Sequence, residues 1–373
     1  MKIPYFVPWI TPQDKKSVLK ALDQRWLTNG PILKKFEEKF KQFIDTKYSS
    51  GVGSATQALH LSLRALEIGA NDEVIVPTFT FTATANVVKY CGAKPVFVDV
   101  DINTFNIMPK EIEKKITRKT KAIIVVHYGG QACDMDKISS ISKKHGINII
   151  EDCAHSLGSI YKNQKCGSFG QTGCFSFYPT KVITTGEGGM VTTNNQKIYK
   201  KVELLRSQGM SIQPIERESK ASWRYDIIDL GYNYRLDEIR SSLGLSQLSR
   251  VNEINKMRIK IAKKYDELIG KIKGITIPKI LHDRNHIYHL YTIKIESDYH
   301  LTRNELFHKL YLHHIGASVQ FYPLHLMSYY KQSSDNKPEN FPNSDKLKDQ
   351  VLSLPIYPTM TTKQVEYVTS CLL

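Results

Sequence analysis

The first two thirds of the chain alternate between short apolar runs and amphipathic stretches. The apolar runs predict strands at 74–76, 95–100, 122–127, 147–151, 174–178 and 190–193. The stretches with apolar residues at helical spacing predict helices over 12–23, 34–42, 56–68, 82–91 and 134–145. Apolar strands separated by helices are typical of a mainly parallel sheet covered on both faces. We therefore expect an α/β domain whose ligands bind beyond the carboxyl ends of the strands.

After about residue 235 the pattern changes to that of a smaller mixed domain. One or two long helices come first, over 236–269, and a last helix covers about 361–371. The elements expected between them are a strand at 291–295, a helix that starts with the capping box of Thr302 and Glu305, a short strand at 319–322 and a polar loop over 331–345. We divide the chain into a large domain, residues 1–250, and a small C-terminal α/β domain, residues 251–373.

The composition is that of a folded water-soluble protein. The 373 residues are 41% hydrophobic and 24% charged, which is enough apolar material for a large core without disulfides or metals. No run of 18 apolar residues predicts a membrane span, and the first residues lack the apolar core of a secretory signal. The six cysteines form no C-x-x-C pair, so we expect reduced thiols in a cytoplasmic protein.

The net charge of +16 raises the question of an anionic partner. The lysines and arginines are scattered along the predicted helices, with no block of five like charges and no aromatic-basic motif of RNA-binding domains. We interpret the charge as a solvated lysine-rich surface that also suits anionic small molecules. Nucleic acid is not an expected partner.

The segment 51–56 is the first candidate site because small residues lead there into a predicted helix. Backbone N–H groups at a helix start bind phosphate. The segment also half-matches the dinucleotide motif G-x-G-x-x-G, with Asp72 about twenty residues later. Thr56 replaces the third glycine, however, and Asp72 precedes its strand. A phosphate site and a plain tight turn both remain open here.

Two further candidates follow strands. Phe81, after the strand 74–76, either stacks on a flat ligand or belongs to the core. Asp152 ends the strand 147–151, where a buried acid requires a cation or a proton donor. With His127 and His155 this acid could bind a metal, but there is no H-E-x-x-H or cysteine-pair motif, so we predict no metal.

The fourth candidate is Lys181, the single lysine between Lys165 and Lys197. Most lysines are solvated surface residues, but a lysine beside apolar surface loses its proton and attacks carbonyls. The fifth candidate, 231–235, is a turn that carries the amide of Asn233 and is uninformative alone. Together, a phosphate cradle, an aromatic ring, a buried acid and such a lysine are the parts of a pyridoxal phosphate (PLP) site. The lysine forms a Schiff base there, and the acid pairs with the pyridine nitrogen.

Five segments give the chain a close resemblance to one enzyme family. The segments SATQALHLSL, PTFTFTATAN, EDCAHSLG, SFYPTKVITTGEGG and LGYNYRLDEI, in this order and spacing, resemble the DegT/DnrJ/EryC1/StrS sugar aminotransferases. The resemblance continues from IPYFVPWI near the start to LSLPIYP near the end. It implies the PLP-dependent transferase fold type I, with a mainly parallel seven-stranded sheet flanked by helices. It also implies a homodimer with shared active sites.

The resemblance assigns roles to individual residues. Lys181 would hold PLP and Asp152 would pair with its pyridine nitrogen. The other implied cofactor contacts are Phe81 against the ring, His155 near the ring or its hydroxyl, Ala55, Thr56 and Ser176 at the phosphate, and Asn233 at the phosphate of the second subunit's cofactor. The implied contacts near the sugar are Thr28, Asn29, Gly30, Tyr322 and His325.

The chain departs from the family pattern at Ala55, Tyr178, Val182, Gln208 and Gln320, mostly in positions that concern substrate fit. Lys181 argues against the branch of the family that carries histidine there and performs dehydration. The resemblance implies transfer of an amino group from L-glutamate to a keto sugar. We expect a nucleotide-linked 4-keto-6-deoxy or 3-keto sugar, for a glycan or a glycosylated metabolite. The alternatives are an amino-cyclitol transaminase, another PLP enzyme of the family and a non-catalytic PLP-binding sensor.

Overall fold

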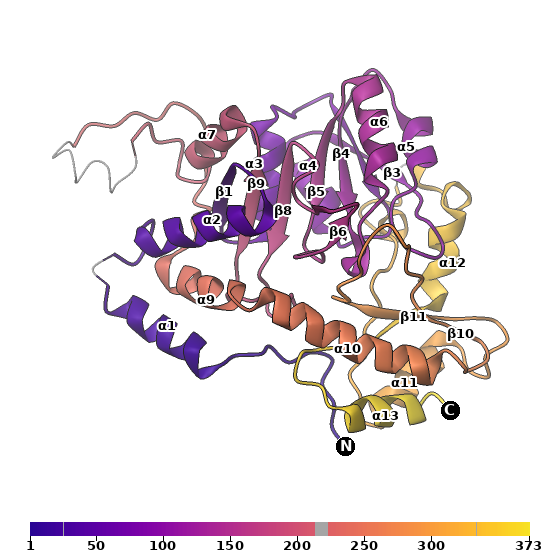
Figure 1. Cartoon of the computed structure of the whole chain (residues 1–373). Helices are drawn as coiled ribbons and strands as arrows, with labels where there is room; N and C mark the ends of the chain where they lie inside the picture. Colours follow the sequence, from indigo (N-terminus) through magenta and orange to yellow (C-terminus); the bar gives the residue numbers. More distant parts are fainter. Residues whose placement is uncertain (25, 213–222, 333) are drawn as a thin grey trace.

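A large sheet organises the first part of the chain. The computed structural model describes residues 1–24, 26–212, 223–332 and 334–373 (Figure 1). Within these residues seven strands form the large sheet, in the spatial order β1 (Tyr48–Val52), β9 (Gly189–Thr193), β8 (Thr172–Ser176), β5 (Asn148–Asp152), β4 (Thr120–Val126), β2 (Glu73–Pro77) and β3 (Lys94–Val98). The strands from β8 to β3 are parallel, whereas β9 is antiparallel to both β8 and β1. The expected mainly parallel seven-stranded sheet is confirmed.

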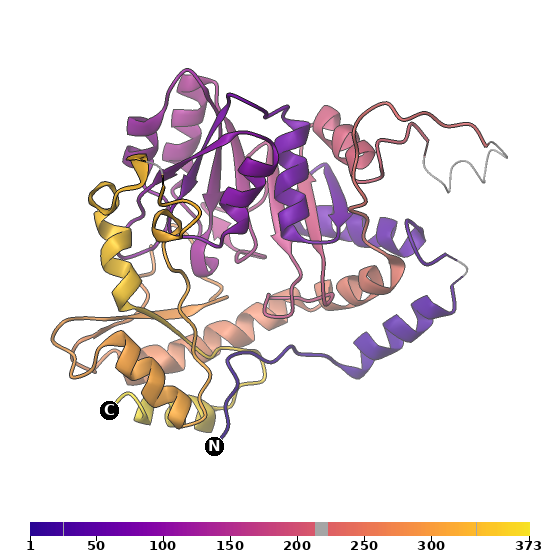
Figure 2. The same cartoon turned by 180° about the vertical axis from the view of Figure 1, so that it is seen from behind.

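Helices cover both faces of this sheet, as the apolar strands predict. One face is covered by α2 (Pro31–Ile44), α5 (Pro109–Lys115) and α6 (Met135–His145), and the other by α3 (Ala55–Ala65), α4 (Ala83–Tyr90) and α7 (Gln196–Leu205). Figure 2 shows α3 and α4 in front of the strands. Successive strand residues enter opposite cores, because Ile149 packs with α6 on one face and Ile150 packs with α3 on the other.

Three helices link the large sheet with the C-terminal part of the molecule. They are α1 (Pro12–Leu22), α9 (Glu238–Leu248) and α10 (Val251–Ile269). Helix α9 packs between α1 and α2, and α10 continues along the base of the molecule in Figure 1. The break between α9 and α10 lies within the predicted helical stretch 236–269, so the two-helix interpretation is confirmed.

A second sheet forms the C-terminal core. It consists of the antiparallel strands β10 (Ile275–Thr276), β11 (Tyr291–Ile295) and β12 (Val351–Leu354). Around it lie α11 (Arg303–Leu312), α12 (Pro342–Gln350) and α13 (Thr362–Ser370), and a small hairpin of β6 (Ile160–Tyr161) and β7 (Gln164–Lys165) lies beside the large sheet. Ile3 packs into this second core, and Phe341 packs into a core of the large sheet. The domain boundary at residue 250 therefore stays a prediction.

Two local predictions in this part are wrong. Residues 319–322 form no strand; a single backbone bridge links Ser318 to Ser353, and Val319 and Phe321 turn toward an apolar cluster around Phe79. The polar loop predicted over 331–345 is interrupted by α12, which begins at Pro342 because proline suits the first turn of a helix. Ser333, within that predicted loop, lies outside the described residues.

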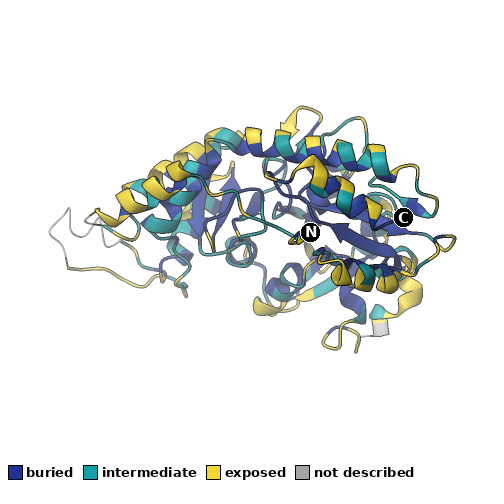
Figure 3. Cartoon of the chain, turned by 90° about the horizontal axis from the view of Figure 1, so that it is seen from below, coloured by how far each residue is buried: buried dark blue, intermediate teal, exposed yellow. Residues whose placement is uncertain are grey.

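The distribution of exposed residues agrees with a folded globular protein. Figure 3 shows exposed residues along the outer sides of the helices and buried residues along the strands. Across the described ranges, no helix combines the length and apolar character that crossing a membrane would require. All six cysteines are unpaired.

Candidate active site

The candidate segments gather at one edge of the large sheet, where the parallel strands end. Residues 80–84 follow β2, and residues 152–155 and 176–181 begin at the last residues of β5 and β8. Residues 51–56 begin near the end of β1, which runs in the same direction as β8. The fifth segment, 231–235, pairs with the end of β1 through a bridge from Arg235 to Val52. Ligands of open α/β sheets bind at this edge, so the topology brings the five predicted segments together.

Lys181 lies in the connection between β8 and β9. Its backbone N–H donates to the Tyr178 carbonyl at 2.9 Å, and its side chain is half-buried. Burial lowers the pKa of Lys181 from 10.5 to about 8, and the negative charge of Asp152 opposes part of this shift. The lowered pKa increases the neutral fraction of the amine at a given pH compared with an exposed lysine. The alternative interpretation as a solvated surface lysine is wrong.

Asp152 ends β5 and is buried with 6% of its surface exposed. The Thr84 hydroxyl donates to its Oδ2 at 3.0 Å, and the Ala154 N–H donates to its Oδ1 at 3.1 Å. Burial raises the pKa of Asp152, while these hydrogen bonds and the charge of Lys181 act in the opposite direction. A cation at this position would stabilise the carboxylate, which is what a protonated pyridine nitrogen supplies.

His155 lies three residues after Asp152 in a ring cluster. The Gly129 N–H donates to its Nδ1 at 3.4 Å, which leaves the proton of the neutral ring on Nε2. Burial first, and the positive charge of Lys181 second, hold the pKa of His155 well below its usual value. Its ring lies parallel to that of Phe321, with 5.8 Å between centroids, and 4.4 Å from that of His289. His155 is thus a neutral donor.

Phe81 is exposed, with 59% of its surface accessible, and its ring centroid lies 6.3 Å from that of Phe321. It precedes α4, the helix that also carries Thr84. The interpretation of Phe81 as a core residue is therefore wrong, because a large apolar ring is left without a covering side chain. Its position suits stacking on a flat ligand.

The segment after β1 forms an anion cradle. Ala55 and Thr56 are the first residues of α3, and Ser54 caps the helix by accepting the Gln57 N–H at 3.2 Å. Among the described residues, no hydrogen bond uses the N–H groups of Ala55 and Thr56. A Cβ at Gly189 would lie 2.5 Å from the Ser54 carbonyl carbon, so glycine lets β9 approach this turn. Free N–H groups at a helix start bind phosphate.

Ser176 and Asn233 are the other two residues that the sequence predicts at the phosphate. Ser176 ends β8 half-buried, and Asn233 is exposed in an extended segment bridged to Ser207. Tyr232 and Tyr234 stack on each other with centroids 4.9 Å apart, so Asn233 between them points the other way. No hydrogen bond of the Asn233 amide is found within the described part of the chain. The amide therefore does not cap its own turn.

The residues expected near the sugar differ in how far they are buried. Thr28 is exposed, whereas the Gly30 N–H is buried and donates to Glu238 at 2.9 Å. Asn29 lines a cavity of about 330 Å³ between α2 and α7. Tyr322 is exposed, but His325 is fully buried and shares a 2.8 Å hydrogen bond with Thr78. A role of these residues in substrate binding stays a prediction.

His127, which the sequence offers as a metal ligand together with Asp152 and His155, has other neighbours in the structure. His127 instead contacts Glu151, at 3.0 Å, on the opposite face of the sheet, near Cys153. The Glu151 carboxylate also accepts three backbone N–H groups at 2.8 Å, and His127 Nδ1 accepts the Cys133 N–H at 3.0 Å. Both His127 nitrogens and both Glu151 oxygens therefore have hydrogen-bond partners within the protein.

Sequence reasoning missed three residues of the site. Thr84 donates to Asp152, and the segment PTFTFTATAN could have indicated it, because Thr84 lies on the helix turn after Phe81. His289 and Phe321 surround the His155 ring, but they come from the C-terminal part of the chain. Nothing in the local sequence links them to residue 155.

The donor set fits pyridoxal phosphate. Lys181 supplies an amine of lowered pKa, Asp152 a buried carboxylate that lacks a full countercharge, and His155 a neutral N–H donor. Ala55 and Thr56 have free N–H groups that would suit a phosphate, and Phe81 is an exposed ring that would suit a flat ligand. Each polar group of the cofactor thus has a complementary group at the same sheet edge.

Comparisons with known proteins agree with this site. The family model described as the DegT/DnrJ/EryC1/StrS aminotransferase family matches residues 8–373. The chain is 39% identical to the spore coat polysaccharide biosynthesis protein SpsC of Bacillus subtilis, over 98% of this chain and 95% of SpsC. It is 37% identical to GDP-perosamine synthase of Escherichia coli O157:H7, over 98% and 96%. The putative sugar aminotransferase Spr1654 of Streptococcus pneumoniae, solved in a PMP form, superposes with a TM-score of 0.94 at 32% identity and covers 100% of this chain and 98% of its own.

Proposed function

The chain belongs to the DegT/DnrJ/EryC1/StrS aminotransferase family and is a PLP-dependent sugar aminotransferase, and from this premise we propose that it transfers the amino group of L-glutamate to a nucleotide-linked keto sugar. A 4-keto-6-deoxy sugar is the preferred acceptor. The half-buried Lys181 of lowered pKa beside the buried Asp152 supports the amino transfer. The similarity to GDP-perosamine synthase supports the nucleotide-linked acceptor.

The chemistry is divided between the cofactor and the protein. Bound PLP supplies an electron sink for the carbon that gains or loses the amino group. Lys181 Nζ accepts the proton that the α-carbon of glutamate loses, and in the second half-reaction it delivers a proton to the former ketone carbon of the sugar. Asp152 would keep the proton on the pyridine nitrogen, and His155 would offer its Nε2–H to the cofactor ring or its hydroxyl. Ala55, Thr56 and Ser176 bind the phosphate.

The acceptor is tested with a panel of ketones and L-glutamate. We expect amino sugar from nucleotide-linked 4-keto-6-deoxy sugars, and much slower reaction with the same sugars without the nucleotide. The measurement is mass spectrometry of the product together with the 2-oxoglutarate formed. Faster reaction with a keto-cyclitol than with every nucleotide sugar would contradict the proposal and favour an amino-cyclitol transaminase. Faster reaction with a 3-keto sugar would correct the position of amination.

The pKa of Lys181 predicts how cofactor loading depends on pH. Only the neutral amine of Lys181 attacks the cofactor aldehyde. Below the pKa, the concentration of this neutral amine increases tenfold per pH unit. Because burial lowers this pKa to about 8, the loading rate of the apoenzyme should rise up to about pH 8 and level off above it. Stopped-flow absorbance of PLP binding measures this profile. A rate that still rises through pH 10 would indicate an ordinary exposed lysine.

We also propose that the enzyme is a homodimer in which Asn233 binds the phosphate in the partner's site. The exposed, unpaired amide of Asn233 supports this, because the phosphate oxygens accept more hydrogen bonds than one chain supplies. Lys181→Ala chains mixed with Asn233→Ala chains should form hybrids with one intact site, and the mixture should regain activity that neither variant has alone.

The matched control mixes Lys181→Ala chains with Asp152→Asn chains. Both of these residues belong to the same chain's site, so no hybrid has an intact site and no activity should return. Equal recovery in the two mixtures, or a monomer in light scattering, would contradict the shared site.

A further inference from the structure

We propose that the buried ion pair between Glu37 and Arg206 positions the phosphate-binding part of the active site. Glu37 lies on α2, and Arg206 follows the last residue of α7. The inference rests on the proposed phosphate contacts of Ala55, Thr56 and Asn233. It concerns two residues that belong to none of the five candidate segments.

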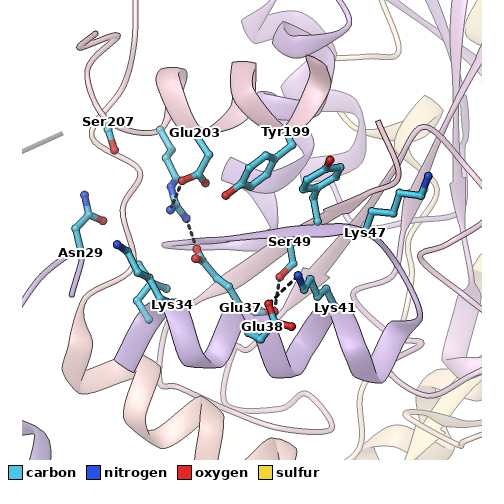
Figure 4. Close-up of a pocket in the computed structure, with 13 residues that line it drawn as sticks. Asn29, Lys34, Glu37, Glu38, Lys41, Lys47, Ser49, Tyr199, Glu203 and Ser207 are labelled. Carbon is cyan, nitrogen blue, oxygen red and sulfur yellow. Dashed lines mark hydrogen bonds and ion pairs between the residues drawn. The ribbon is translucent and has the colours of Figure 1, made fainter. Parts of the chain in front are cut away.

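The pair is buried and tightly bonded. Arg206 has 5% of its surface exposed, and its Nη1 lies 2.6 Å from Glu37 Oε1. Its Nη2 donates to Glu203 Oε2 at 2.8 Å. Figure 4 shows Glu37 of α2 and Glu203 of α7 extending toward each other across the cavity between the two helices. One guanidinium thus links two helices that lie on opposite faces of the sheet.

The pair also holds the strand that enters the cradle. Arg206 Nη1 donates to the Gly51 carbonyl at 2.6 Å, and the Gly51 N–H donates to Glu37 Oε1 at 2.8 Å. The Ser50 hydroxyl donates to Glu203 at 2.6 Å. The end of β1 is therefore held through both backbone groups of Gly51. Three residues separate Gly51 from Ala55, where the anion cradle begins.

The same arginine holds the segment that carries Asn233. The Arg206 carbonyl accepts the Tyr234 N–H at 3.0 Å, and the Leu205 carbonyl accepts the Tyr232 N–H at 2.6 Å. The Tyr234 carbonyl of the same segment accepts the Gly53 N–H at 3.1 Å. Movement of Arg206 would therefore shift both the cradle and the Asn233 segment.

A purely structural role makes a different prediction. Removing one member of a buried ion pair leaves the other without countercharge, which destabilises a protein wherever the pair lies. A general loss of stability would weaken the binding of ligands with a phosphate and of ligands without one to the same extent. A positioning role does, because the displaced N–H groups and the Asn233 segment act on the phosphate alone. Comparison of PLP with pyridoxal, which lacks the phosphate, therefore separates the two roles.

The experiment measures dissociation constants of PLP and pyridoxal for the full-length apoenzyme by absorbance titration, with thermal unfolding recorded in parallel. At metal sites, replacing an outer residue that orients a ligand typically lowers the affinity about tenfold or more. We use this scale for the phosphate site. We expect Glu37→Gln to weaken PLP binding about tenfold and to leave pyridoxal binding unchanged. Glu38→Gln is the matched control, because Glu38 neighbours Glu37 on α2 but is exposed and pairs with Lys41, and it should change neither constant.

Arg206→Lys tests the pair if Glu37→Gln does not fold. Lysine keeps the charge but lacks the planar fork that reaches both carboxylates and Gly51, so PLP binding alone should again weaken. If the ratio of the PLP and pyridoxal dissociation constants is the same in both variants as in the wild type, the inference is wrong. Ser176→Ala reports on the phosphate site itself. If it leaves the ratio unchanged while Glu37→Gln alters it, the assignment of Ser176 under the proposed function fails and the positioning role stands.

Discussion

Replacing Lys181 by alanine should abolish turnover, with activity reduced by at least about 10³-fold. Lys181 is the group that attacks the cofactor aldehyde and that carries protons to and from the reacting carbons, so alanine removes two functions together. The measurement is the rate of 2-oxoglutarate formation from glutamate in the presence of a keto sugar. The variant should also lose the visible absorbance of the lysine-bound cofactor.

Lys197→Ala is the control for this prediction. Lys197 is exposed at the start of α7, and its removal should leave both the rate and the absorbance unchanged. If the Lys181→Ala enzyme kept more than a trace of transamination, the assignment of Lys181 would be wrong.

Asp152→Asn should lower activity by roughly 10²–10³-fold, which is typical when one preorganised electrostatic partner is removed. Asparagine has nearly the same shape and keeps an oxygen for the Thr84 hydroxyl or the Ala154 N–H. It carries no charge, so it no longer stabilises a protonated pyridine nitrogen. The fold and the thermal unfolding temperature should remain close to those of the wild type, because a buried carboxylate without a cation is itself costly.

Asp72→Asn serves as the matched substitution. Asp72 would bind a ribose in the dinucleotide alternative, but it accepts the Gly69 N–H at 3.0 Å in the turn before β2. The PLP account predicts normal activity for this variant. A near-normal rate for Asp152→Asn, or a large loss for Asp72→Asn, would be incompatible with the proposed roles.

The fold was predictable where strands are uniformly apolar. The run AIIVVH predicts β4 and the strand at 147–151 predicts β5, because parallel strands buried on both faces leave a continuous apolar signal. Strand β1 escaped prediction because its sequence, YSSGV, is mostly small and polar. Its partners explain this composition, since Ser49 and Gly51 bind Glu37 of α2 and Ser50 binds Glu203 of α7.

The site was predictable only as far as local motifs reach. Lys181 and Asp152 follow strands directly, so their positions at the sheet edge could be inferred from order alone. The packing of Phe321 and His289 around His155 depends on how the C-terminal part folds back onto the large sheet, which no local pattern specifies. The same holds for the contact of Glu37 with Arg206, which are 169 positions apart.

The most direct test of the account is a two-step absorbance experiment on the purified PLP-loaded enzyme. L-Glutamate alone should bleach the visible band of the lysine-bound cofactor and release one 2-oxoglutarate per site. Addition of a nucleotide-linked keto sugar should then restore the band and yield an equal amount of amino sugar. A band that glutamate leaves unchanged, with no 2-oxoglutarate formed, would contradict the account and indicate a protein that binds PLP without catalysing transamination from glutamate.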